Sequence, residues 1–193
     1  MADAKYCYPD SNVLRNKLGI TDADALLEAE IECASARLLG LQMRPVEGGF
    51  DFRHLCEIHR RIFQDLFEWA GQPRTVNIGK GNLFCLVEHI QPFAAEIFAK
   101  FYGECFAARS DRERFVRALA KHYGDLNALH PFREGNGRAQ REFARELCLK
   151  CGYVFDLTHT NHQEMLAASI RSFNIDNAEL ERIFDRAVNP LAE

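Results

Sequence analysis

Residues 130–141 read HPFREGNGRAQR, a stretch that combines the end of one helix, a tight turn and the start of a second helix. Pro131 fixes its own φ and disfavours helical geometry at His130, so a preceding helix should end there. Gly135 and Gly137 allow the backbone to turn tightly and to approach a ligand closely. The fourteen residues after this turn contain neither proline nor glycine and favour a helix that begins near Gly137. The stretch therefore predicts a helix, a loop and a helix that together hold a site rigidly.

The side chains of this stretch suit the chemistry of phosphate groups. A helix N-terminus presents unpaired N–H groups and the positive end of a dipole, which attract anions. Arg138 and Arg141 lie three residues apart, so both should reach one polyphosphate from the same helix face. Glu134 suits a Mg²⁺ ion that bridges phosphate oxygens, and His130 suits the removal of a proton from a hydroxyl, since histidine titrates near neutral pH. Each feature alone has an ordinary structural explanation, but their concentration in one window favours a catalytic site.

The same residues resemble the signature of the Fic family, His-Pro-Phe-x-(Asp/Glu)-Gly-Asn-Gly-Arg-x-x-Arg, and match it at every defined position. The resemblance extends over about residues 50–172. It implies a protein adenylyltransferase, an enzyme that uses ATP and Mg²⁺ to move AMP onto a Tyr, Thr or Ser hydroxyl of a target protein. We therefore expect an all-α, Fic-type helical bundle with one β-hairpin flap.

The resemblance also implies a role for most residues of the motif. His130 is expected to be the catalytic base, and Glu134 is expected to hold the Mg²⁺ ion. The Asn136 side chain is expected on the α-phosphate, and the arginines are expected on the β- and γ-phosphates. The implied nucleotide-binding residues of the motif are Gly135, Asn136, Gly137, Arg138 and Arg141. Phe132 is expected to point into the core and to anchor the loop.

Apolar periodicity and capping residues predict seven or eight helices along the chain. Thr21, Ser110 and Thr160 are the expected N-caps of three of them. The main helices are expected over residues 21–40, 51–71, 90–106, 111–129, 137–151, 160–172 and 176–189. We find no internal repeat or linker, so the prediction is one Fic-type domain over residues 1–193 with a core at about 50–172.

A β-hairpin is predicted within residues 73–88 because two β-favouring runs flank a glycine-rich turn. The runs are 75–78 and 83–87. A two-stranded hairpin is marginally stable alone, so it should lie on the helices or pair with a partner strand. The resemblance implies that this flap pairs with the backbone of the target. The residues expected to pair are Val76, Asn77 and Ile78, and those expected near the nucleotide are Asn82 and Phe84.

Many Fic proteins carry an inhibitory helix with the pattern Ser/Thr-x-x-x-Glu-Gly/Asn, whose Glu pairs with the second arginine of the motif. No full copy occurs in this sequence, because Thr160 and Glu164 have the right spacing but are followed by Met165. We therefore expect a separate small antitoxin that supplies the inhibitory Glu in trans, with this chain as the toxin. Type II topoisomerase ATPase subunits are possible targets by analogy alone.

Three other functions fit parts of the pattern. Fic relatives also transfer UMP, phosphocholine or phosphate, although the intact turn, its arginines and Glu134 favour a nucleoside triphosphate. The second is a catalytically silent module that binds a partner strand on the flap, and the intact His130 argues against it. The third is a metal hydrolase built on His130 and Glu134, which lacks further ligands at suitable spacing.

The composition is that of an ordinary globular protein, with 193 residues, 47% hydrophobic residues and a net charge of −4. This mild acidity predicts no direct binding to nucleic acid or to an anionic membrane. The sequence contains no apolar run long enough for a membrane span and no signal peptide pattern at its start, which predicts a cytoplasmic protein. The seven cysteines should be reduced, and Cys148 and Cys151 are interpreted as packing residues rather than as a zinc or redox pair.

Overall fold

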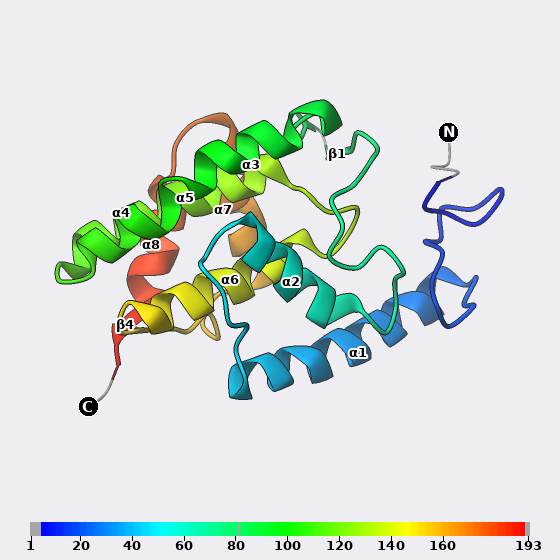
Figure 1. Cartoon of the computed structure of the whole chain (residues 1–193), viewed down its shortest axis with the longest axis horizontal. Helices are drawn as coiled ribbons and strands as arrows, with labels where there is room; N and C mark the ends of the chain where they lie inside the picture. Colours follow the sequence, from blue (N-terminus) through cyan, green and yellow to red (C-terminus); the bar gives the residue numbers. More distant parts are fainter. Residues whose placement is uncertain (1–4, 81, 192–193) are drawn as a thin grey trace.

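Helices α5 (Arg112–Leu129) and α6 (Asn136–Lys150) form the centre of the fold, and the loop between them carries the first half of the motif (Figure 1). The computed structural model describes residues 5–80 and 82–191. The surrounding helices are α1 (Ala23–Met43), α2 (Phe52–Phe63), α3 (Ile90–Phe98), α4 (Phe101–Ala108), α7 (His162–Asn174) and α8 (Ala178–Ala187), with a 3₁₀ turn at Val87–His89.

The core forms where α5 packs against α3, α4, α6, α7 and α8. Phe115, Leu119, Leu126 and Leu129 recur at helical spacing on α5, and all four are fully buried. Phe143 extends the same core from α6 toward α2. Because most helical stability comes from such packing, these apolar stripes explain why the helices form. The expected all-α bundle is confirmed.

Most helix boundaries lie within three residues of the expected ones, but α2 ends at Phe63 and not near Gly71. The Leu66 N–H bonds to the Phe63 carbonyl, so the chain leaves the helix in a tighter turn. The caps of α1, α5 and α7 lie one residue later than predicted, where the side chains of Asp22, Asp111 and Asn161 accept a hydrogen bond from the backbone. Helix α1 continues past Gly40, because this glycine keeps a right-handed conformation and so does not end the helix. The single helix expected over residues 90–106 is divided into α3 and α4.

The hairpin lies within residues 73–88 as predicted, but its strands are shorter than predicted and the first one begins later in the chain. Strands β1 (Gly79–Lys80) and β2 (Asn82–Leu83) pair in antiparallel register, whereas residues 75–78 form no strand. Side chains bind the backbone groups that a longer ladder would use. Arg74 donates to the Val76 carbonyl at 2.8 Å, and the Asn77 side chain accepts from the Val87 N–H at 2.9 Å. The prediction of a strand over residues 75–78 is therefore wrong.

A second pair of strands lies on the opposite side of the fold from the flap. Strand β3 (Tyr153–Phe155) pairs in antiparallel register with β4 (Val188–Pro190), whose first two residues were expected to belong to the last helix. This pair joins the end of α6 to the end of α8 (Figure 1). No helix among residues 5–80 and 82–191 is both long and apolar enough to cross a membrane.

Candidate active site

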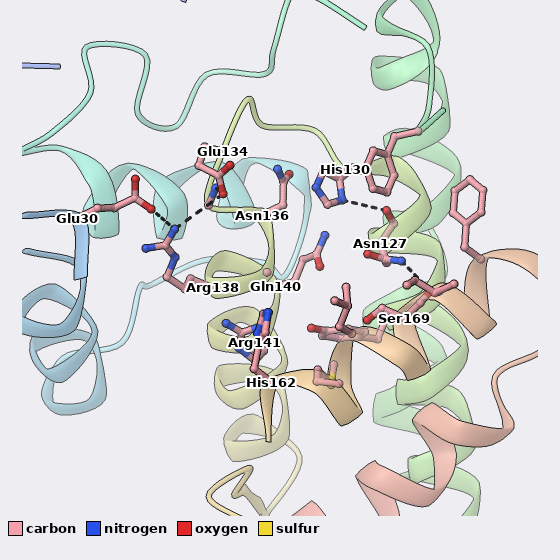
Figure 2. A pocket seen from close by; sticks show the side chains of 18 of the residues that line it. Glu30, Asn127, His130, Glu134, Asn136, Arg138, Gln140, Arg141, His162 and Ser169 are labelled. Carbon is pink, nitrogen blue, oxygen red and sulfur yellow. Dashed lines mark hydrogen bonds and ion pairs between the residues drawn. The ribbon is translucent and has the colours of Figure 1, made fainter. Parts of the chain in front are cut away.

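A cavity of about 890 Å³ opens beside the motif, between the N-terminal half of α6 and helices α1 and α7. Figure 2 shows His130, Glu134, Arg138 and Arg141 around it. The remaining lining is largely apolar and includes Leu27, Ile31, Phe84, Met165, Leu166, Ile170 and Phe173. The structure thus brings the sequence-predicted motif residues to one cavity with a charged floor and apolar walls.

His130 ends α5 in a left-handed conformation, with φ of 42°. This conformation is unfavourable for a residue with a Cβ and costs on the order of 1–3 kcal/mol. The imidazole stacks on the Phe84 ring at a centroid distance of 3.7 Å, and its Nδ1 lies 3.3 Å from the Asn127 carbonyl oxygen (Figure 2). Because a carbonyl only accepts, Nδ1 donates in this contact. In the neutral ring the basic lone pair then resides on Nε2.

The turn before α6 requires glycine for a steric reason. Gly135 has a φ of 79°, and a Cβ at this position would lie 2.3 Å from the Phe63 ring. At Gly137 a Cβ would come within 3.0 Å of an Arg141 guanidinium nitrogen. The turn therefore keeps the first N–H groups of α6 close to the cavity, as an anion site requires.

The Asn136 side chain is directed into the motif loop. Its Oδ1 accepts from the Phe132 N–H, and its Nδ2 donates to the Phe132 carbonyl, both at 2.8 Å. The side chain is 3% exposed. The amide therefore closes the loop on itself through Oδ1 and one of its two Nδ2 hydrogens, and the expected contact with the α-phosphate would use the other hydrogen.

His59 of α2 contacts the same loop through a hydrogen bond to the Glu134 backbone and a stack on the Phe132 ring. Its Nδ1 accepts from the Gly71 N–H at 2.8 Å, and its Nε2 lies 3.0 Å from the Glu134 carbonyl and donates to it. The ring stacks on Phe132, which is fully buried as the sequence analysis expected. Burial lowers the pKa of His59 to about 3, so the ring is neutral at physiological pH. A neutral histidine is the form that can accept at one nitrogen and donate at the other.

Arg138 forms an ion pair with Glu30 of α1, a partner that the sequence analysis missed (Figure 2). Glu30 is only 8% exposed. The Arg138 guanidinium also lies 3.9 Å from a Glu134 oxygen and 4.7 Å from the centre of the Phe63 ring. The sequence could have indicated this partner, because Glu30 lies four residues after Leu26 and therefore on the apolar face of its helix. A charged residue on such a face needs a partner.

Arg141 differs from Arg138 in its surroundings. Among the residues that the structure describes, no carboxylate lies within ion-pair distance of Arg141. Its neighbour is the buried Tyr123: burial raises the pKa of this phenol, and the positive charge of Arg141, together with a hydrogen bond to it, opposes the shift. One motif arginine is thus already paired with a carboxylate, and the other meets a neutral hydroxyl.

Glu134 is the one carboxylate within residues 130–141, and it lies two residues before the start of α6. Its Oε1 accepts from the Gly135 N–H at 2.9 Å, and its side chain is 39% exposed to the cavity. The described residues contain no group of three potential metal ligands. A single accessible carboxylate fits Mg²⁺, which proteins commonly hold through one or two carboxylates together with substrate phosphates and water.

Of the residues expected on the flap, Phe84 lines the cavity, whereas residues 76–78 lie outside its lining. Phe84 lines the cavity and stacks on His130, as a residue near the nucleotide would. Asn82 lies in β2, but its side chain falls outside the described residues. Val76 and Ile78 are half-buried and Asn77 is exposed in the irregular leg before β1. That leg follows the flap edge without forming the predicted strand.

Comparisons with known proteins agree with this architecture of helix, glycine turn and helix around one cavity. Residues 49–148 match the model of the Fic/DOC family. The chain belongs to that family.

The most similar relatives include two proteins of nearly the same length. "Probable protein adenylyltransferase y4lH" of Sinorhizobium fredii is 40% identical over 176 residues, which cover 90% of each chain. "Probable protein adenylyltransferase Fic" of Salmonella typhimurium is 35% identical over 189 residues, covering 97% of this chain and 94% of the relative. Among solved structures, the N-terminal Fic domain of a VirB-translocated Bartonella quintana effector with bound ADP superposes with a TM-score of 0.92. It is 26% identical, covering 99% of this chain and 97% of that one.

Proposed function

We propose that this protein is an adenylyltransferase that moves AMP from ATP to a hydroxyl side chain of a target protein. The observation that carries the proposal is the shared cavity, where His130 faces the N-terminus of α6 and the two motif arginines. The names of the relatives and the ADP bound in the Bartonella domain support the same activity and the same donor.

The residues of the site suit each part of this transfer. The target hydroxyl oxygen forms a bond to the α-phosphorus of ATP, and the bond from that phosphorus to the bridging oxygen of the β-phosphate breaks. Pyrophosphate leaves with the bonding electrons, and the hydroxyl proton passes to Nε2 of His130. Arg138, Arg141 and the N–H groups of α6 bind the phosphate tail and hold it in line.

Glu134 is the residue that would hold Mg²⁺ in this site, because its carboxylate is accessible at the phosphate end of the cavity. The bound metal would neutralise charge on the phosphates and on the leaving pyrophosphate. The protein's own contribution is the placement of that carboxylate, which the Gly135 N–H holds at the start of α6.

The flap is the proposed docking site for the target. Residues 76–78 run as an exposed to half-buried leg, and the Phe84 N–H donates to the Ile78 carbonyl at 3.2 Å. The Phe84 ring in turn stacks on the proposed base. A target segment that pairs with this leg through main-chain groups would bring its hydroxyl to His130. This arrangement favours recognition of an extended segment in the target.

We also propose that a small helical antitoxin regulates the site. Leu27 and Ile31 on α1 are each 56% exposed beside the cavity, and Leu166 and Ile170 on α7 are 47% and 55% exposed. An amphipathic helix could cover these side chains and bring a carboxylate to Arg141. The seven free cysteines fit a reducing compartment, which supports action in the cytoplasm.

The decisive experiment incubates the purified chain with Mg²⁺, bacterial lysate and ATP labelled on the α-phosphate. We expect discrete labelled proteins with the wild type and none with His130→Ala, because the loss of a general base costs ~10²–10⁴-fold. Calorimetry should show that His130→Ala still binds ATP. His159→Ala, a change at an exposed histidine, is the matched control and should transfer normally.

Parallel reactions with α-labelled UTP test the alternative donor. Labelling by UTP in place of ATP would assign a different nucleotide to the same chemistry. Equal labelling by wild type and His130→Ala would overturn the role of His130. A wild type that cannot bind ATP would overturn the proposal as a whole.

A further inference from the structure

Arg74 lies between the flap and the motif loop, where its side chain donates to three backbone carbonyls. Nε donates to the His130 carbonyl at 2.9 Å, Nη1 donates to that of Val76 at 2.8 Å, and Nη2 donates to that of Cys85. The backbone N–H of Arg74 also donates to the Pro131 carbonyl at 2.8 Å. One residue thus joins the motif loop to both legs of the flap.

The surroundings of Arg74 are unusual for a charged side chain. The residue is 2% exposed, and no carboxylate among the described residues lies within ion-pair distance of it. Burial lowers its pKa, yet an arginine stays charged in a folded protein. An unpaired buried charge is unfavourable unless its hydrogen bonds are satisfied. Here each of the three guanidinium nitrogens donates to a carbonyl, a geometry that a lysine ammonium cannot reproduce.

The contact with His130 is made at the strained point of the loop. His130 is left-handed, with φ of 42°, and Arg74 bonds to the carbonyls of two consecutive residues, His130 and Pro131. The Phe84 ring stacks on the His130 imidazole at a centroid distance of 3.7 Å. Cys85, the residue after Phe84, has its carbonyl bound by Arg74 as well. The same guanidinium therefore fixes the backbone of the base and the residue after its stacking partner.

We propose that Arg74 is a positioning residue that locks His130 and the flap in one arrangement, so that a hydroxyl held by the flap meets the imidazole. This inference rests on the proposed function. Arg74 contacts neither Glu134 nor the two motif arginines among the described residues. Its loss should therefore lower the rate of transfer and leave the affinity for ATP unchanged. A purely stabilising role would not separate these two quantities.

The test compares Arg74→Lys with Arg112→Lys. Arg112 is a matched control, because its fork also binds a carbonyl, that of Val188 at 3.0 Å, and pairs with Asp185 far from the cavity. For each variant we would measure the binding of Mg²⁺-ATP by calorimetry and the initial rate of label transfer to lysate proteins over a range of ATP concentrations. Arg74→Lys should lose ~10²-fold in maximal rate, with the dissociation constant and apparent KM within about twofold of wild type. Arg112→Lys should change neither.

Transfer by Arg74→Lys at the wild-type rate, or a loss that follows its ATP affinity, would overturn the proposal. A measurement on the wild type covers the case in which the variant does not fold. Hydrogen exchange of the Arg74 Nε–H, followed by NMR, should be at least ~10²-fold slower than that of the exposed Arg44. Equal exchange would show that Arg74 does not hold the loop, whether or not the chain transfers AMP.

Discussion

Glu30 and a bound triphosphate would compete for the same guanidinium, because Glu30 already pairs with Arg138 at the phosphate end of the cavity. Removing its charge frees that arginine and removes a like charge from the neighbourhood of the phosphates. We predict that Glu30→Gln binds ATP about fivefold more tightly, which corresponds to about 1 kcal/mol for a partly exposed pair. Titration calorimetry with Mg²⁺-ATP measures this change.

Two comparisons make the effect of Glu30→Gln specific to the phosphate tail. AMP has no β- or γ-phosphate, so its affinity should be the same in wild type and variant. Glu32→Gln removes an exposed charge two residues further along the same helix and should alter neither ligand. Weaker ATP binding by Glu30→Gln would mean that Glu30 orients Arg138 for the nucleotide and does not compete with it.

His59 makes the stability of the fold depend on pH. Its pKa is lowered by burial to about 3, whereas an unfolded chain protonates a histidine below about pH 6.5. Between these values the unfolded state binds one more proton, so the free energy of unfolding falls as the pH drops. From pH 7 to pH 5 this loss should be on the order of 2 kcal/mol, measured by urea unfolding at both values.

His59→Gln is the matched variant, because its side-chain amide has an NH₂ group that donates and a carbonyl oxygen that accepts, but it does not titrate. It should be less stable than wild type at pH 7 and should lose less stability on acidification to pH 5. An identical loss in both proteins would assign the pH dependence to other groups.

At the residue scale, the sequence identifies the motif but not its supports. His130, Glu134 and the two arginines are recognisable because they fall within twelve consecutive positions. Glu30, His59 and Arg74 reach the motif across 108, 75 and 56 residues. No local pattern fixes contacts at such separations, since they depend on how the helices pack. The bonds of the Asn136 side chain to the Phe132 backbone inside the loop are likewise not apparent from the sequence.

At the element scale, the leg over residues 76–78 is the proposed edge for target pairing. We predict that Ile78→Pro, which removes one backbone N–H and restricts the preceding residue, lowers label transfer to protein targets by roughly tenfold or more. ATP affinity should remain at the wild-type value, because Ile78 does not line the cavity. Ile78→Val keeps the N–H and the apolar side chain and should transfer normally.

The elements also show where local patterns are informative. Helices α1, α5, α6 and α7 lie within three residues of the expected bounds, because apolar residues recur over several turns of each helix. Helix α2 begins as expected but ends eight residues early, since the apolar residues Leu66 and Trp69 continue the helical spacing into a segment of turns. The first strand of the flap was predicted four residues too early, and the second was predicted too long. The Arg74 side chain binds the Val76 carbonyl and the Asn77 side chain binds the Val87 N–H, so β propensity alone could not indicate where the ladder begins.

At the scale of the whole molecule, α1 and α7 carry exposed apolar side chains on the two sides of one cavity. If an antitoxin helix covers them, polar substitutions there should release it with little effect on stability, since both positions on α1 are exposed. We predict that a small partner co-purifies from the native host with wild type but not with the double variant Leu27→Asn/Ile31→Asn. The double variant should then label lysate proteins faster than the wild-type complex. Leu39→Asn/Met43→Asn is the matched control on the same helix, because these residues are 61% and 79% exposed outside the cavity, and it should retain the partner. Purification of all three proteins as single, equally active chains would show that no partner inhibits this site.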